Sequence, residues 1–181
     1  MSVEVAGLFD IMHVRQPEGS EKCFAAIVAS VADLDIDTAH DALTKSQLSG
    51  PDGSTPPILL SKKISLGEVS TLSIEPLVKP ADRLDDAASA LSVICDEIDV
   101  KNPVALLHKK TEDPADGRHH WMLITSRIFD MDTTHLVGVM DPLKSDREFY
   151  KAPDIEDIVD RSLKYAGISA CALVLEKPEA S

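Results

Sequence analysis

Aromatic residues make up only 4% of this 181-residue chain, and its 18 basic side chains are outnumbered by 31 acidic ones. The formal net charge of −13 repels phosphate backbones and anionic lipid, so we expect no nucleic-acid partner and no membrane partner. No apolar run approaches the roughly 20 residues that span a bilayer. The N-terminus also lacks the basic start and continuous apolar stretch of a signal peptide. These absences predict a cytoplasmic location and leave export without a signal peptide open.

Cysteine is scarce as well. The three cysteines, Cys23, Cys95 and Cys171, are an odd number at wide spacings, which favours a reduced compartment over a disulfide framework. They form no paired CxxC motif, and we expect neither a metal ion nor another cofactor. Hydrophobic residues make up 44% of the chain and charged residues 27%, which is typical of a folded protein. The length indicates one domain over residues 1–181.

The first part of the chain, about residues 1–101, is predicted to be mostly helical. Apolar residues recur at helical spacing between residues 21 and 34, which places Cys23 in the first turn of a buried helix. Pro, Gly and Ser between residues 49 and 57 give the strongest loop signal in the sequence. The other predicted elements here are a helix over 38–48, a short helix over 58–63, a strand over 70–78, and a helix that Asp82 caps and that extends to Ile98.

The second part, about residues 102–181, is predicted to form a sheet. Short apolar runs rich in β-formers, PVALLH, HWMLITSRIF and HLVGVMD, predict three strands, and SACALVLE predicts a fourth. A helical pattern over 154–165 separates the third strand from the last. Helices followed by an antiparallel sheet predict an α+β fold.

A nucleophilic thiol is the first candidate for chemistry. Unpaired N–H groups and the macrodipole at a helix N-terminus favour a thiolate, so Cys23 is well placed. Cys95 and Cys171 lie in apolar runs and are interpreted as packing residues. A cysteine nucleophile needs a histidine base and a group that orients the base.

Three polar residues further along the chain meet that need. His119 and His120 open a predicted strand, and because side chains alternate along a strand, only one of them can face the site. Asp141 ends the next strand just before Pro142, where a carboxylate can accept a hydrogen bond from an imidazole. The order along the chain is therefore Cys, His, Asp.

These motifs resemble those of papain-like cysteine peptidases, in particular the compact bacterial domains that process bacteriocin leaders at a double glycine. The resemblance rests on Gln16 seven residues before Cys23, on HHWMLITS and on VGVMDPL. It implies a papain-like fold, in which the helix that carries the nucleophile packs on the sheet. It implies a peptide or protein substrate, Cys23 as nucleophile, His120 as base and Asp141 as its orienter. Gln16 and the backbone N–H of Cys23 would then stabilise the oxyanion.

Several alternatives stay open at this point. His119 is the base if the strand register shifts by one residue. A zinc site of His119, His120 and Asp141 is disfavoured, because adjacent histidines face opposite sides of a strand. The same triad also serves acyltransferases and transglutaminase-like enzymes, in which an amine replaces water. A degenerate papain-like module that binds a peptide or protein without cutting it is the non-enzymatic alternative.

Overall fold

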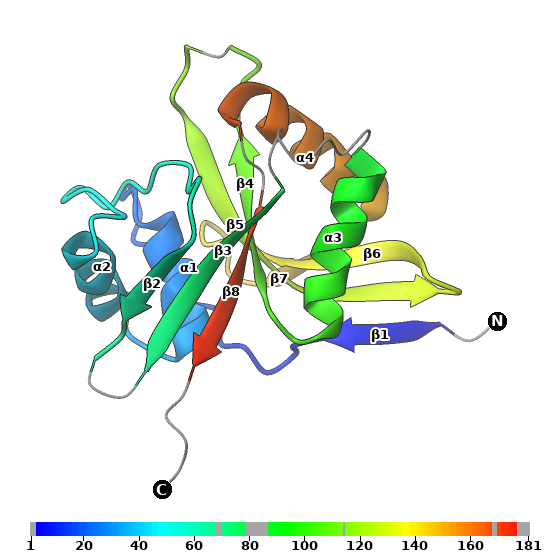
Figure 1. Cartoon of the computed structure of the whole chain (residues 1–181), viewed down its shortest axis with the longest axis horizontal. Helices are drawn as coiled ribbons and strands as arrows, with labels where there is room; N and C mark the ends of the chain where they lie inside the picture. The colour runs from blue at the N-terminus through cyan, green and yellow to red at the C-terminus, as the bar shows by residue number, and fades with distance from the viewer. Residues whose placement is uncertain (1–2, 68–69, 79–86, 114, 168–169, 177–181) are drawn as a thin grey trace, which may run out of the picture.

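The computed structural model describes residues 3–67, 70–78, 87–113, 115–167 and 170–176 (Figure 1). These residues form four helices and eight strands, and every pair of neighbouring strands is antiparallel. The fold is therefore α+β, as expected. In chain order, the elements are β1 Glu4–Gly7, α1 Cys23–Ala32, α2 Ile36–Lys45, β2 Lys62–Ser65, β3 Thr71–Val78, α3 Ala87–Asp99, β4 Val104–Lys109, β5 His119–Asp130, β6 Thr133–Met140, β7 Arg147–Lys151, α4 Ala152–Ala166 and β8 Ala170–Glu176.

The strands form one sheet in the order β2-β3-β8-β4-β5-β6-β7, and β1 pairs with β5. The first half of β5 pairs with β4, and its second half pairs with β1 on the same edge. On the other edge, the pairing with β6 begins where Leu123 lies opposite Met140. Because β6 ends at Met140, the first residues of β5 extend past the end of β6.

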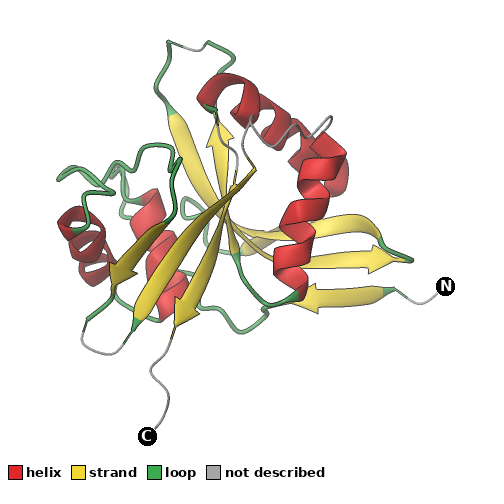
Figure 2. Cartoon of the chain, viewed as in Figure 1, coloured by secondary structure: helices red, strands yellow, loops and turns green. Residues whose placement is uncertain are grey.

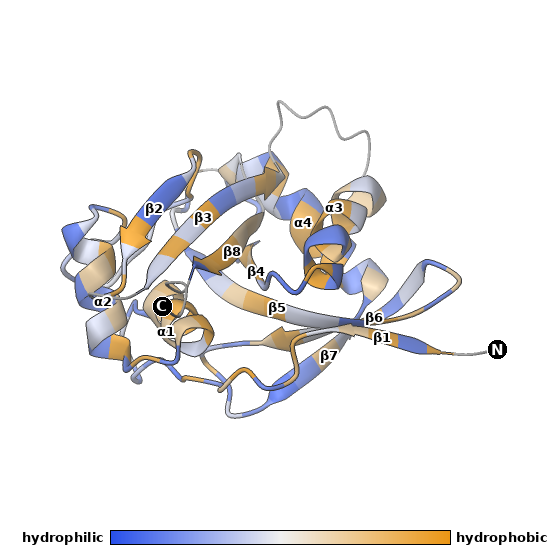
Figure 3. Cartoon of the chain, turned by 60° about the horizontal axis from the view of Figure 1, so that its bottom comes forward, coloured by the Kyte–Doolittle hydropathy of each residue, from blue (hydrophilic) through white to orange (hydrophobic). Residues whose placement is uncertain are grey.

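Helices cover both faces of the sheet (Figure 2). On one face, α1 packs against alternate residues of β4, β5 and β8, such as Leu107, Trp121 and Leu173. On the other face, α3 and α4 pack against the residues between them, such as Leu106 and Met122. Figure 3 shows the two layers on opposite sides of β5. This alternation follows from the two-residue period of a strand and produces two separate apolar clusters.

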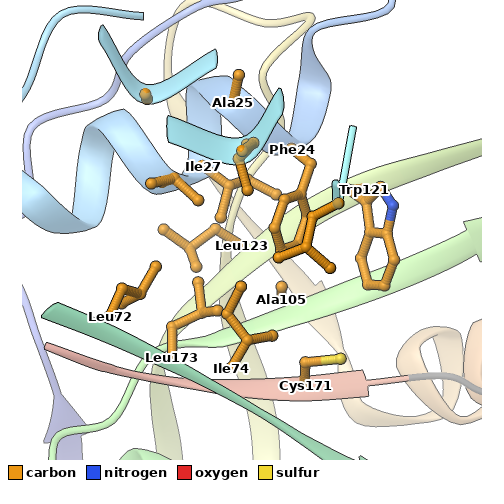
Figure 4. Close-up of a cluster of buried hydrophobic side chains, with 14 of the residues drawn as sticks. Phe24, Ala25, Ile27, Leu72, Ile74, Ala105, Trp121, Leu123, Cys171 and Leu173 are labelled. Carbon is orange, nitrogen blue, oxygen red and sulfur yellow. The ribbon is translucent and has the colours of Figure 1, made fainter. Parts of the chain in front are cut away.

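Helix α1 is apolar around its whole circumference. Residues 23–30 are all buried, which is expected of a helix enclosed by a sheet on one side and another helix on the other. Phe24 and Trp121 meet edge to face, with ring centroids 5.0 Å apart, beside the other apolar side chains of this layer (Figure 4). The helix ends at Ala32, and the left-handed conformation of the next residue, Asp33, turns the chain so that the N–H of Leu34 donates to the carbonyl of Ala29 at 3.0 Å.

Some expectations from the sequence are wrong. The short helix expected over residues 58–63 is absent. Strand β2 forms over Lys62–Ser65 by antiparallel pairing with β3, and it buries Ile64. The strand expected over residues 70–78 is confirmed as β3. The expected division into a mostly helical part before residue 102 and a sheet after it is wrong, because β1 and β2 also precede that point. Strands β1 and β7 were not anticipated. The expected cap Asp82 lies outside the described residues.

Within the described part of the chain, no helix has the length and apolar character required to cross a bilayer.

Candidate active site

Cys23 is the first residue of α1, and only 7% of its surface is exposed. The preceding residue, Lys22, caps the helix without a side-chain hydrogen bond. The backbone N–H groups of the first turn have no partner within the helix, because each would need a carbonyl one turn earlier. The sulfur therefore lies beside backbone dipoles that favour a negative charge.

His120 and Asp141 meet where β5 extends beyond β6. His120 is the second residue of β5, and Asp141 directly follows the last residue of β6. His120 Nε2 lies 2.6 Å from Asp141 Oδ1, and both residues are more than nine-tenths buried. The N–H of Leu143 also donates to Asp141 Oδ1, at 2.9 Å. The carboxylate is thus fixed by its own turn and directed at one nitrogen of the imidazole.

The side chain of Cys23 is the other polar group that acts on the His120 ring. Burial alone lowers the pKa of His120, but the hydrogen bonds and negative charges of Asp141 and Cys23 outweigh it and raise this pKa to about 9. For Asp141, burial raises the pKa, and the hydrogen bonds from His120 and the Leu143 amide lower it more strongly. The imidazole is therefore charged at neutral pH.

Gln16 lies on a segment that docks against the Asp141 turn. Its backbone N–H donates to the carbonyl of Pro142 at 3.0 Å, and its side-chain Nε2 donates to the carbonyl of Ser20 at 2.6 Å. These contacts attach Gln16 both to the turn that holds Asp141 and to the chain just before Cys23. One of its two amide hydrogens remains for another acceptor.

The same segment carries His13, which the sequence did not single out. Its Nε2 lies 3.0 Å from the backbone carbonyl of Asp141. His13 thereby adds a second attachment between the N-terminal segment and the residue that holds His120.

His119 has a different set of partners. Its Nε2 lies 2.8 Å from the carbonyl of Thr55, and its Nδ1 lies 2.9 Å from the carbonyl of Gly117. Trp121, on the same face of β5, donates its Nε1 hydrogen to the same Thr55 carbonyl at 3.1 Å. Both ring nitrogens of His119 thus lie within hydrogen-bond distance of backbone carbonyl oxygens. Because side chains alternate along β5, His119 contacts these carbonyls while His120 contacts Asp141.

The loop of residues 49–57 forms one wall of a cleft beside Cys23. The hydroxyls of Ser49 and Thr55 bond to each other, and His40 Nε2 lies 3.2 Å from the Gly50 carbonyl. Sequence patterns identified this segment as a loop. The cleft has a volume of about 490 Å³ and is lined by Glu21, Cys23, Asp52, Ser54, Thr55, Lys110, Gly117, Arg118 and His119. Its charged lining consists of two acidic side chains, Glu21 and Asp52, and two basic ones, Lys110 and Arg118.

A metal centre finds no support in the described residues, where no group of three or more His, Cys, Asp or Glu side chains is arranged to hold an ion. Comparisons of the chain with protein-family models, curated proteins and solved structures give no match. The chemistry of the site is therefore argued from its own geometry.

Proposed function

We propose that the protein is a papain-like cysteine peptidase that cleaves peptide bonds through a thioester. The observation that carries this proposal is the buried contact of His120 Nε2 with Asp141 Oδ1, together with the Cys23 side chain as the other group that acts on the same ring. A nucleophile, a base and an orienting group in this relation form the core of nucleophilic catalysis by cysteine. The placement of Cys23 at the start of a helix packed on the sheet supports the papain-like assignment, together with the motif resemblance.

The charge state of the triad supports an activated nucleophile. Because the pKa of His120 is raised to about 9, its ring is an imidazolium at neutral pH. In the proposed mechanism the proton on this ring is the one that Cys23 gives up, because the thiolate is the reactive form of the thiol. Asp141 fixes the ring orientation and stabilises its positive charge, as the third member of a triad does.

The reaction then follows from the atoms in place. The Cys23 thiolate attacks the carbonyl carbon of the scissile bond, and the negative charge moves to the carbonyl oxygen. The backbone N–H of Cys23 and the free amide hydrogen of Gln16 are the donors for that oxyanion. As the C–N bond breaks, His120 gives its proton to the leaving amine, and a thioester remains on Cys23.

Deacylation reverses the role of the base. The neutral His120 takes a proton from water, and the resulting hydroxide attacks the thioester. The C–S bond breaks, the acid product leaves, and the thiolate–imidazolium pair is restored. When an amine replaces water, the same step becomes acyl transfer.

Labelling by a peptidyl chloromethyl ketone, together with turnover of a peptide library, tests this proposal. Cys23→Ala should abolish both, His120→Ala should slow both, and Cys95→Ala is the matched control. Cys95 is also a buried helical cysteine, but its pKa is raised by burial, so its thiol stays protonated. Labelling that persists in Cys23→Ala would contradict the assignment. Labelling without turnover would instead favour a binding module, and a product that requires added amine would favour acyl transfer.

A further inference from the structure

A second histidine, His108, lies next to His120 and has no role in the proposed reaction. In the β4–β5 register, His108 is the direct partner of His120. Directly opposed residues of an antiparallel pair project to the same face of the sheet with neighbouring Cβ atoms. The two imidazoles are therefore adjacent, and His108 is half-buried on the face that α4 covers.

The backbone around His108 is held in place by α4. Among the described residues, the pairing of β8 with β4 extends to Leu106, and Ser162 of α4 bonds the next part of that edge. Ser162 Oγ donates to the carbonyl of Leu107 at 2.6 Å and accepts from the N–H of Lys109 at 3.3 Å. These bonds lie on either side of His108 and act as a strand partner would. His108 is thus fixed against His120.

The charges that act on His108 come from three neighbouring elements and the site itself. Burial lowers the pKa of His108, and the positive charges of His120 on β5, Arg161 on α4 and Lys110 after β4 lower it further. Only Asp141 acts in the opposite direction among these groups. At neutral pH, His108 is therefore neutral while His120 carries its proton.

Building on the proposed function, we infer that His108 is a positioning residue for the pair of His120 and Cys23. While His108 is neutral, the His120 imidazolium stays paired with Cys23. When His108 is protonated, the pair is lost. A proton on His108 places two positive rings side by side. Repulsion of like charges then favours transfer of the His120 proton back to the thiolate. The result is a neutral thiol, which is a far weaker nucleophile. The activity of the site would then fall in acid because His108 is protonated, in addition to any protonation within the triad.

Alkylation of Cys23 by iodoacetamide, followed by mass spectrometry from about pH 4.5 to pH 8, tests the inference without a known substrate. The wild-type rate should fall steeply in acid, because two protonations oppose the pair. In His108→Gln the fall should be shallower and displaced to lower pH, so that the variant reacts up to about tenfold faster than wild type near its acid limit. His135→Gln, a change of an exposed histidine on β6, is the matched control and should follow the wild-type profile. Coincident profiles for His108→Gln and wild type would overturn the inference.

Two further measurements keep the outcomes separate. If His120→Ala leaves the alkylation of Cys23 unchanged, the thiolate–imidazolium pair is wrong, and the proposed function fails together with the role of His108. If His120→Ala slows alkylation and His108→Gln changes nothing, only the role of His108 fails. Imidazole ¹⁵N chemical shifts of the wild-type protein need no variant: His108 should titrate below its ordinary pKa of 6.5, and titration above that value would contradict the inference.

Discussion

Replacement of Asp141 by asparagine isolates the charge that holds His120. Asparagine has the size of aspartate, and its Oδ1 can accept hydrogen bonds from His120 Nε2 and from the Leu143 amide as the carboxylate does. Packing is therefore preserved, and the negative charge is lost. We expect the variant to be less stable than wild type, and the loss to depend on pH.

The size of the effect follows from the pKa of His120. A rise from 6.5 to about 9 corresponds to about 3 kcal/mol of preference for the charged ring in the folded state. Asp141 and Cys23 share this preference, so the loss assigned to Asp141 is about 1 to 2 kcal/mol. Because the folded-state pKa lies above the unfolded value, this stabilisation is complete below about pH 6.5 and disappears as the pH rises through about 9.

Urea unfolding of both proteins at about pH 6 and about pH 9.5 measures the difference. The free energy of unfolding of Asp141→Asn should lie below that of wild type. This deficit should be about 1 to 2 kcal/mol larger at the lower pH than at the higher. The removed desolvation cost of the buried carboxylate is the same at both pH values, so it does not affect this comparison. Asp157→Asn, at an exposed position of α4, is the matched control. A difference that is equal at both pH values, or larger at the higher one, would refute the reasoning.

Three further outcomes are expected. Peptide turnover should fall as the pH rises through about 9, because His120 then loses the proton that the leaving amine requires, and a pH–rate profile flat beyond that point would contradict it. Gly53→Ala should lower the free energy of unfolding by about 1 kcal/mol or more and slow labelling of Cys23, since Gly53 has φ +93° and an added Cβ would lie 2.6 Å from Lys22 Cγ. Gly117→Ala, where an added Cβ meets nothing within 4 Å, should change stability little and serves as its control. Ser162→Ala should cost about 1 to 3 kcal/mol in thermal or urea unfolding, because it removes a buried hydroxyl that bonds β4 on two sides, and an unchanged stability would show that water replaces it.

The members of the candidate triad could be found in the sequence because each has a local signal. Cys23 stands at the start of an apolar helical pattern, His120 at the start of a strand, and Asp141 at the end of one before a proline. The structure brings these three side chains together. Their catalytic roles stay predictions until the labelling experiment is done.

Other features depend on contacts between distant segments, which leave no local pattern. Strand β1 has four residues and forms because β5 extends beyond β4 and offers it an edge. The carbonyl of Thr55 meets His119 and Trp121, more than 60 residues away along the chain. Strand β2 was mistaken for a helix because a short apolar run fits both periods, and only its pairing with β3 decides between them.

The adjacent histidines show how one strand can build two parts of the site. Strand alternation sends His120 to Asp141 and Cys23, whereas His119 joins the loop of residues 49–57 to the start of β5 through the Thr55 carbonyl. A slip of one residue between β4 and β5 would exchange these directions, because every side chain would change face. The register that places His108 opposite His120 therefore decides both which histidine meets the thiol and which one holds the cleft wall. Correct pairing of β4 with β5 is thus a requirement of the proposed chemistry as well as of the fold.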